Sequence, residues 1–143
     1  MSALLLFATP EDVETAFYRA FLDEDLDDLM EIWSEEEEVF CVHPTGQRLS
    51  GLTMIRESWQ SLMNPARTGI RQIDVTCLLK WQTMLMATHQ LVETLRLDQE
   101  QAGPMIVTHT YMRGSCGWRL VCRHCSASSE TILMPESAGH VLH

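Results

Sequence analysis

The chain has 143 residues, the size of one compact domain, which excludes a repeat array and leaves little room for a second catalytic domain. Hydrophobic residues make up 45% of it and charged residues 21%, as in an ordinary globular protein with a packed core. The formal net charge of −10 disfavours a nucleic-acid or anionic-membrane partner, because such partners require a basic face.

The N-terminal segment resembles neither a signal peptide nor a membrane span. Its longest apolar run, residues 3–8, follows no basic residue and is too short to cross a bilayer. We therefore expect a cytoplasmic protein that does not bind a membrane.

The five cysteines are an odd number in a chain large enough to fold without disulfides, so reduced and mostly buried thiols are expected. Cys122 and Cys125 have the CxxC spacing. They fall on a predicted strand, where residues three apart point to opposite faces, so the two sulfurs would diverge. This placement argues against a redox or zinc site.

Three helices are predicted in the first half of the chain. The first begins with Thr9 as its cap and Pro10 as its first residue. Apolar residues then recur at helical spacing: Val13, Ala16, Phe17, Ala20 and Phe21. A shorter helix begins near Asp25, and a third ends at Asn64–Pro65. Through Glu38 the chain has thirteen acidic residues and one basic residue, so we assign the acidity to exposed helix faces.

Strands dominate the remainder. Val39–His43 has the pattern of a short buried strand, and from Ile70 the hydrophobic period changes to two. The first strand is predicted from Ile70 to a turn near 80–82, and the second over 83–97. A polar connection over 98–103 leads to the third strand over 105–113. A tight turn over 114–117 then precedes the last strand over 118–126.

Helices followed by an antiparallel meander predict a single α+β domain over residues 1–126, with the helices covering one face of the sheet. The tail, residues 127–143, is weakly patterned and is expected either to be flexible or to contact a partner subunit.

The last hairpin brings polar residues together. If its turn has an even number of residues, His109 faces Cys122, and His124 becomes a diagonal neighbour of His109 on the same face. Glu93 shares one face of the preceding strand with His89. If the two faces coincide, Glu93, His109 and His124 form a cluster on an otherwise apolar sheet.

Such a half-buried cluster could perform general acid–base catalysis, because burial raises carboxyl pKa values toward neutrality. A hydrogen-bonded trio of core residues is the alternative. Together with His43 these residues could also ligate a metal, but their spacing matches no metal-binding motif. We therefore expect no metal and no cofactor.

Trp33 and Trp59 are predicted either as core residues or as walls of a pocket, since a buried indole N–H needs a partner.

The order of these motifs resembles the nuclear transport factor 2 (NTF2)-like superfamily, and more narrowly its SnoaL-like and DUF4440-type bacterial members, which are related to ketosteroid isomerase. The resemblance covers residues 9–126 and rests on short motifs in order: Thr9–Asp12 with Phe17, Asp25–Met30 with Trp33, Val42–Pro44 with Gly46, Gly51 with Trp59, and Gly117–Arg119 through His124 to Ser126.

The resemblance implies a cone-shaped, cystatin-like α+β fold, in which three N-terminal helices pack on a curved antiparallel sheet around an apolar pocket. It also implies homodimers formed through the outer sheet face. Trp33, His43, Trp59 and His124 match positions that SnoaL-like proteins often fill in the same way. The chain departs from that pattern at His109, where Asn is common, and at Arg123, where a second His is common.

Two functions remain open. The first is a homodimeric pocket protein that binds a small apolar or cyclic molecule and catalyses metal-independent isomerisation, dehydration or hydrolysis. In that version Glu93 or His109 is the base, and His124 or His43 donates or orients. Ligand contacts would come from Trp33, His43, Trp59 and Tyr111. The second is a non-catalytic ligand-binding or dimeric interaction module. A ketosteroid isomerase mechanism is disfavoured, because no Asp pair accompanies Tyr111.

Overall fold

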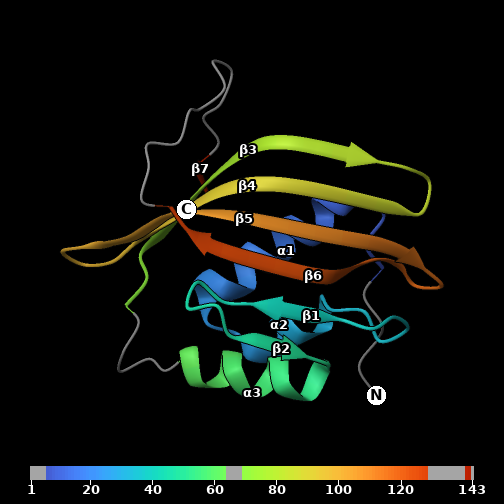
Figure 1. Cartoon of the computed structure of the whole chain (residues 1–143), viewed down its shortest axis with the longest axis horizontal. Coiled ribbons are helices and arrows are strands. Elements are labelled where there is room, and N and C mark those ends of the chain that lie inside the picture. Colours follow the sequence, from blue (N-terminus) through green and yellow to red (C-terminus); the bar gives the residue numbers. More distant parts are fainter. Residues whose placement is uncertain (1–5, 64–68, 129–140, 143) are drawn as a thin grey trace.

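The computed structural model describes residues 6–63, 69–128 and 141–142 (Figure 1). Its helices are α1 (Pro10–Asp23), α2 (Leu26–Glu31) and α3 (Leu52–Leu62). Its strands are β1 (Phe40–Val42), β2 (Arg48–Ser50), β3 (Gln72–Gln82), β4 (Met86–Arg96), β5 (Gln101–Gly114), β6 (Gly117–Ala127) and β7 (Val141–Leu142). The predicted α+β class with three N-terminal helices is confirmed.

Local sequence signals explain where the first two helices begin. The hydroxyl of Thr9 accepts a hydrogen bond from the backbone N–H of Asp12 at 3.1 Å, and Pro10 occupies the first turn of α1. Asp25 caps α2 in the same way through the N–H of Asp28 at 3.0 Å. The apolar stripe of α1 is buried, and Figure 1 shows α1 lying behind the curved sheet.

Within the described residues the sheet has seven strands, in the order β2-β1-β6-β5-β4-β3-β7. All neighbouring pairs are antiparallel except β1 and β6, which are parallel. β1 enters the sheet after two helices rather than after a hairpin turn, so it is free to run parallel to β6.

Two connections in the meander differ from the predicted ones. The turn expected near 80–82 lies over 83–85, where the Thr83 hydroxyl accepts from the N–H of Met86 at 3.1 Å. Trp81 instead continues β3, as suits an aromatic side chain. The connection expected over 98–103 is shorter, because the N–H of Leu97 bonds to the carbonyl of Glu100 at 2.9 Å. The short strands β2 and β7 were not predicted.

A β-bulge near the last turn reverses the faces predicted for the rest of β6. The tight turn over 114–117 and the pairing next to it are as predicted. Farther along, β6 contains one extra residue, Val121, which has no partner in the register of β5. A shift of one residue moves every later side chain to the other face. His109 therefore lies opposite Arg123, not opposite Cys122.

The cysteines are free thiols, and Cys41, Cys122 and Cys125 are buried. The register places Cys122 and Cys125 on opposite faces of β6, as expected for residues three apart. Burial raises the pKa of each of these two thiols to about 11, so both stay protonated at neutral pH.

Part of the predicted tail, residues 129–140 and 143, lies outside the described residues, as does the predicted helix end at Asn64–Pro65. Within the tail, Val141–Leu142 pairs with β3 of the same chain. Among the helices that the structure describes, none is both long and apolar enough to cross a membrane.

Candidate functional site

The inner face of the sheet carries a buried ion pair that reaches across β5. The side chains of Glu93 on β4 and Arg123 on β6 are 3% and 4% exposed. Nη1 and Nη2 of Arg123 donate to Oε2 and Oε1 of Glu93 at 3.0 and 2.8 Å, which matches the planar fork of the guanidinium. Tyr18 on α1 donates its hydroxyl to Oε2 of Glu93 at 2.8 Å. Three hydrogen bonds therefore hold the carboxylate of Glu93.

Arg123 remains charged although it is buried. Burial alone would lower its pKa, but the carboxylate of Glu93 raises the pKa above the ordinary value. The guanidinium also lies 5.0 Å from the ring centre of Phe17 and 5.7 Å from that of Trp59, within cation–π range. The ion pair and the rings together fix the plane of the guanidinium.

His109 extends the network behind the ion pair. Nη1 of Arg123 lies 3.0 Å from Nε2 of His109, and arginine can only donate, so Nε2 accepts. Nδ1 then carries the hydrogen and donates to the hydroxyl oxygen of Tyr111 at 2.9 Å. Tyr111 in turn donates to Oε1 of Glu14 at 3.2 Å. Burial, with Arg123 nearby, lowers the pKa of His109 well below its ordinary value, so the ring is neutral.

The network reaches the surface through α1. His89 lies opposite His109 in the register of β4 and β5. Its Nδ1 is 2.9 Å from Oε1 of Glu14, and its Nε2 is 3.4 Å from Oε2 of Glu11. The side chain of His89 is 1% exposed and that of Glu11 is 46% exposed. A continuous row of polar contacts thus connects the ion pair to the surface.

A cavity of about 200 Å³ lies beside the ion pair. Its walls are mostly apolar and include Phe21, Trp59, Met63, Leu95, Met105 and Cys125. Glu93 and Arg123 are its most buried polar residues. Glu24 also lines the cavity. The cavity therefore combines mostly apolar walls with the ion pair of Glu93 and Arg123 and with one further carboxylate.

His43 adds a second polar group to this cavity. It follows β1, and its Nε2 lies 2.7 Å from Oγ of Ser58 on α3. Its ring centre is 5.7 Å from that of Trp59. Burial, and then the charge of Arg123, lower the pKa of His43, so this ring is neutral at pH 7. His43 can therefore hydrogen-bond a ligand without adding charge.

The structure gathers only some of the predicted site residues. Glu93, His43 and Trp59 line the cavity. His109 and Tyr111 lie behind the ion pair, fully buried, and are not part of the lining. Both act on the cavity only through Arg123.

The structure corrects the predicted position of His124. The bulge places it on the outer face, exposed and opposite Thr108, so it is not a neighbour of His109. The predicted catalytic trio is therefore not assembled, and neither is the alternative set of metal ligands. Over residues 6–63, 69–128 and 141–142, no group of three or more His, Cys, Asp or Glu side chains is arranged to hold a metal ion.

Trp33 also lies away from this cavity. It is 1% exposed, and its backbone forms a bridge with Leu120. It borders a separate depression between the loop that follows α2 and the β5–β6 turn. Its side chain is part of the core, which is one of the two roles predicted for it.

Besides Glu11 at the surface end, sequence reasoning missed three members of the network. Glu14 and Tyr18 are four residues apart on α1, so they share a face, and this spacing was a usable signal. Arg123 gave no such signal, because its position on the inner face depends on the bulge.

This geometry limits the chemistry of the site. Both ring nitrogens of His109 are hydrogen-bonded, and the ring does not line the cavity, so it cannot exchange a proton with a molecule there. Of the roughly four acceptor positions on the carboxylate of Glu93, three are occupied. The arrangement is better suited to holding a ligand than to moving protons.

The chain matches the family model of the SnoaL-like domain over residues 11–130. F-box protein SKIP8 from Arabidopsis thaliana is 23% identical over 114 residues, which are 80% of this chain and 47% of that protein. The chain thus spans about half the length of this curated relative.

Solved structures share the fold. A proposed calcium/calmodulin-dependent protein kinase type II association domain from Thiobacillus denitrificans is 29% identical, with a TM-score of 0.78, covering 87% of this chain and 99% of that one. A proposed dehydratase of the NTF2-like family from Streptomyces avermitilis is 23% identical, with a TM-score of 0.68, covering 82% of this chain and 92% of that one. A proposed ketosteroid isomerase from Parabacteroides distasonis is 16% identical, with a TM-score of 0.63, covering 84% of this chain and 88% of that one.

The family match spans most of the chain, and the solved structures have the same helices-on-sheet architecture. The chain therefore belongs to the SnoaL-like domain family, and its fold is that of solved NTF2-like proteins.

Proposed function

We propose that this protein binds a small, mostly apolar molecule about the size of one ring in the cavity beside Glu93 and Arg123. The observation that carries the proposal is the cavity itself, about 200 Å³ with mostly apolar walls beside the ion pair of Glu93 and Arg123. Apolar cavities of about 150 Å³ are large enough to hold benzene. A cavity of this size favours a single ring over a four-ring steroid.

Binding without catalysis agrees best with the contacts of the buried network. The bases expected from the sequence are either engaged by neighbours, as Glu93 is, or sealed from the cavity, as His109 is. The solved dehydratase and isomerase are less than 25% identical to this chain, so their similarity supports the fold and not their named activities.

Toluene is a suitable first probe of the cavity. We expect it to shift, saturably, the backbone amide signals of Leu95, Met105 and Cys125 in ¹H–¹⁵N spectra, and to raise the melting temperature through its preference for the folded state. The substitution Met105→Trp fills the cavity and should abolish both effects.

Met112→Trp is the matched control, because Met112 is on the same strand but on the outer face of the sheet. This variant should bind toluene as the wild type does. The proposal fails if wild-type cavity amides do not respond to toluene, or if Met105→Trp responds as strongly as Met112→Trp.

We propose as a second candidate that two copies pair through the outer face of the sheet. Leu79, Trp81 and Met86 point outward and are 42%, 65% and 45% exposed. The neighbouring outward positions of β4 and β5 are uncharged, in a chain of net charge −10: Thr88, Gln90, Val92, Ile106, Thr108, Thr110 and Met112.

The similarity to the proposed association domain, at 29% identity, supports an assembly function of this kind. A face of apolar and uncharged polar side chains also agrees with the composition of interface cores, which are depleted of charged residues. The two candidates are compatible, because the cavity and the outer face lie on opposite sides of the sheet.

A further inference from the structure

Ser58 and His43 form a hydrogen-bonded pair outside the buried network. Ser58 lies on α3, and His43 directly follows β1. Oγ of Ser58 is 2.7 Å from Nε2 of His43, which is the separation found between a nucleophile and its general base. A serine inside a helix usually bonds a carbonyl of the preceding turn, whereas within the described residues the hydroxyl of Ser58 bonds only to His43.

The ring of His43 is held in place from two sides. Its backbone is fixed by a turn, since the N–H of Gly46 donates to the carbonyl of His43 at 2.8 Å and the N–H of His43 donates to the carbonyl of Gln47 at 3.1 Å. The ring meets the indole of Trp59 edge-on, with 5.7 Å between the ring centres. The turn and the indole thus orient the base, a task that a third polar group performs in many catalytic sites.

His43 is also in the protonation state that a general base requires. Burial, and then the charge of Arg123, lower its pKa below the ordinary value, so the ring is neutral at pH 7. The tautomer with its hydrogen on Nδ1 leaves Nε2 to accept the hydroxyl hydrogen of Ser58. The oxygen of Ser58 can then attack an electrophile while its proton passes to the ring.

A surface groove of about 540 Å³ gives a substrate access to this pair, and both Ser58 and His43 line it. The groove is distinct from the cavity beside Arg123, although His43 borders both. Its walls combine apolar and polar side chains, including Leu49, Met54, Thr45 and Gln47. Glu57 also lines the groove and is exposed. Its negative charge disfavours anionic substrates, so a neutral compound suits the groove.

We propose that Ser58 is a nucleophile, that His43 is its general base, and that the groove accepts neutral esters for hydrolysis. Oγ of Ser58 attacks the carbonyl carbon of the ester, and its proton passes to Nε2 of His43. The bond to the leaving alcohol then breaks, and His43 returns the proton to the alcohol oxygen. Water hydrolyses the acyl-serine in the same way, which restores Ser58 and releases the acid. This inference goes beyond the proposed function and does not rest on ligand binding in the cavity.

Labelling with a fluorophosphonate tests the nucleophile. The reagent phosphonylates an activated serine and releases fluoride, and mass spectrometry of the digested protein identifies the modified residue. We expect one equivalent of label, on Ser58. Ser61 is the internal comparison, because it borders the same groove one turn farther along α3 but has no histidine within hydrogen-bond distance in the described part of the chain. It should remain unlabelled.

Release of 4-nitrophenol from 4-nitrophenyl acetate, followed at the isosbestic wavelength, measures turnover. Ser58→Ala should fold, because alanine favours helix, and should lower the rate at least tenfold. His43→Gln should lower it about 100-fold. Ser61→Ala is the matched control and should keep the wild-type rate. The wild-type rate should be level near pH 7 and fall toward pH 5, as His43 becomes protonated.

The absence of label on Ser58, equal labelling of Ser58 and Ser61, or an unchanged rate in Ser58→Ala overturns the inference. If His43→Gln does not fold, the site of labelling and the wild-type pH profile still decide the question. Toluene binding is measured separately, so an unreactive Ser58 leaves the proposed function standing. A chain that hydrolyses esters at Ser58 but does not bind toluene would overturn the proposed function alone.

Discussion

The direction of the hydrogen bonds that run from Arg123 through His109 and Tyr111 to Glu14 follows from Arg123, which can only donate. That restriction makes Nε2 of His109 an acceptor and Nδ1 a donor, and it passes the direction on through Tyr111 to Glu14. A neutral His109 with its hydrogen on Nδ1 is therefore part of the folded state. Protonating His109 would direct an N–H at Arg123 and break this order.

Stability should consequently depend on pH through His109. Its pKa in the folded state lies below the ordinary 6.5, because of burial and then of the charges of Arg123 and His89. Below that ordinary value the unfolded chain binds more protons than the folded one, so the free energy of unfolding falls as pH falls. Where the two states differ by one full bound proton, the free energy of unfolding changes by about 1.4 kcal/mol per pH unit.

Urea unfolding at pH 5, 6, 7 and 8 measures this effect. His109→Gln should fold, because its side-chain oxygen can still accept from Arg123, and should lose part of the pH dependence between pH 5 and 6.5. His124→Gln is the control at an exposed histidine and should keep the wild-type slope. Identical pH profiles for wild type and His109→Gln would contradict the expectation.

At the scale of elements, helices and strands differ in how locally they are specified. The start of α1 depends on residues within one short segment and was predicted correctly, since the cap, the first-turn proline and the apolar stripe all lie there. The faces of β6 depend on one bulge residue, Val121, whose position no local pattern announces.

Removing the cap of α1 tests the first of these statements. Thr9→Ala should lower the free energy of unfolding by about 1 kcal/mol, because the N–H of Asp12 loses its acceptor. Thr9→Ser keeps an acceptor oxygen and should remain close to the wild type. Chemical denaturation of the three proteins measures the difference, and an unchanged Thr9→Ala variant would show that the cap does not stabilise α1.

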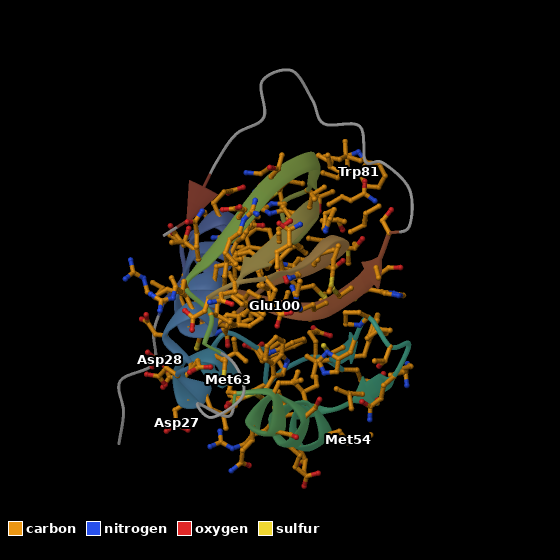
Figure 2. The ribbon with its side chains drawn as sticks, turned by 90° about the vertical axis from the view of Figure 1, so that its left-hand side faces the viewer. Asp27, Asp28, Met54, Met63, Trp81 and Glu100 are labelled. Carbon is orange, nitrogen blue, oxygen red and sulfur yellow. The ribbon has the colours of Figure 1, made fainter. Side chains whose placement is uncertain are left out.

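At the scale of the whole molecule, the outer sheet face and the helical side are opposite surfaces. Figure 2 shows Trp81 and Met54 at opposite ends of the view, Trp81 on the sheet and Met54 on α3. Met86 and Met54 are almost equally exposed, at 45% and 46%. The two methionines therefore provide a matched pair for testing the proposed homodimer.

Met86→Glu should weaken self-association, since it places a charge in the proposed interface. Met54→Glu should leave it unchanged. Sedimentation velocity over a range of concentrations measures the oligomeric state of both variants and the wild type. A monomeric wild type, or equal weakening by both substitutions, would contradict the proposed pairing.

Much of the fold could be predicted from the sequence. Helical and strand periods are properties of short segments, so the three helices, the meander and the common face of His89 and Glu93 were all derivable before the structure. The resemblance to the NTF2-like superfamily added the cone-shaped architecture. The sequence also located the acidity in the helical half.

The site depended on the tertiary structure. Val121 shifts the register of β6, which moves Arg123 to the inner face and His124 to the outer one, so the acid–base trio expected from the sequence became an ion pair with a polar row behind it. The cavity is space that the packed elements leave unfilled, and its size follows from how α1, α3 and the sheet meet. Periodicity describes one segment at a time, whereas register and cavity volume depend on several segments together.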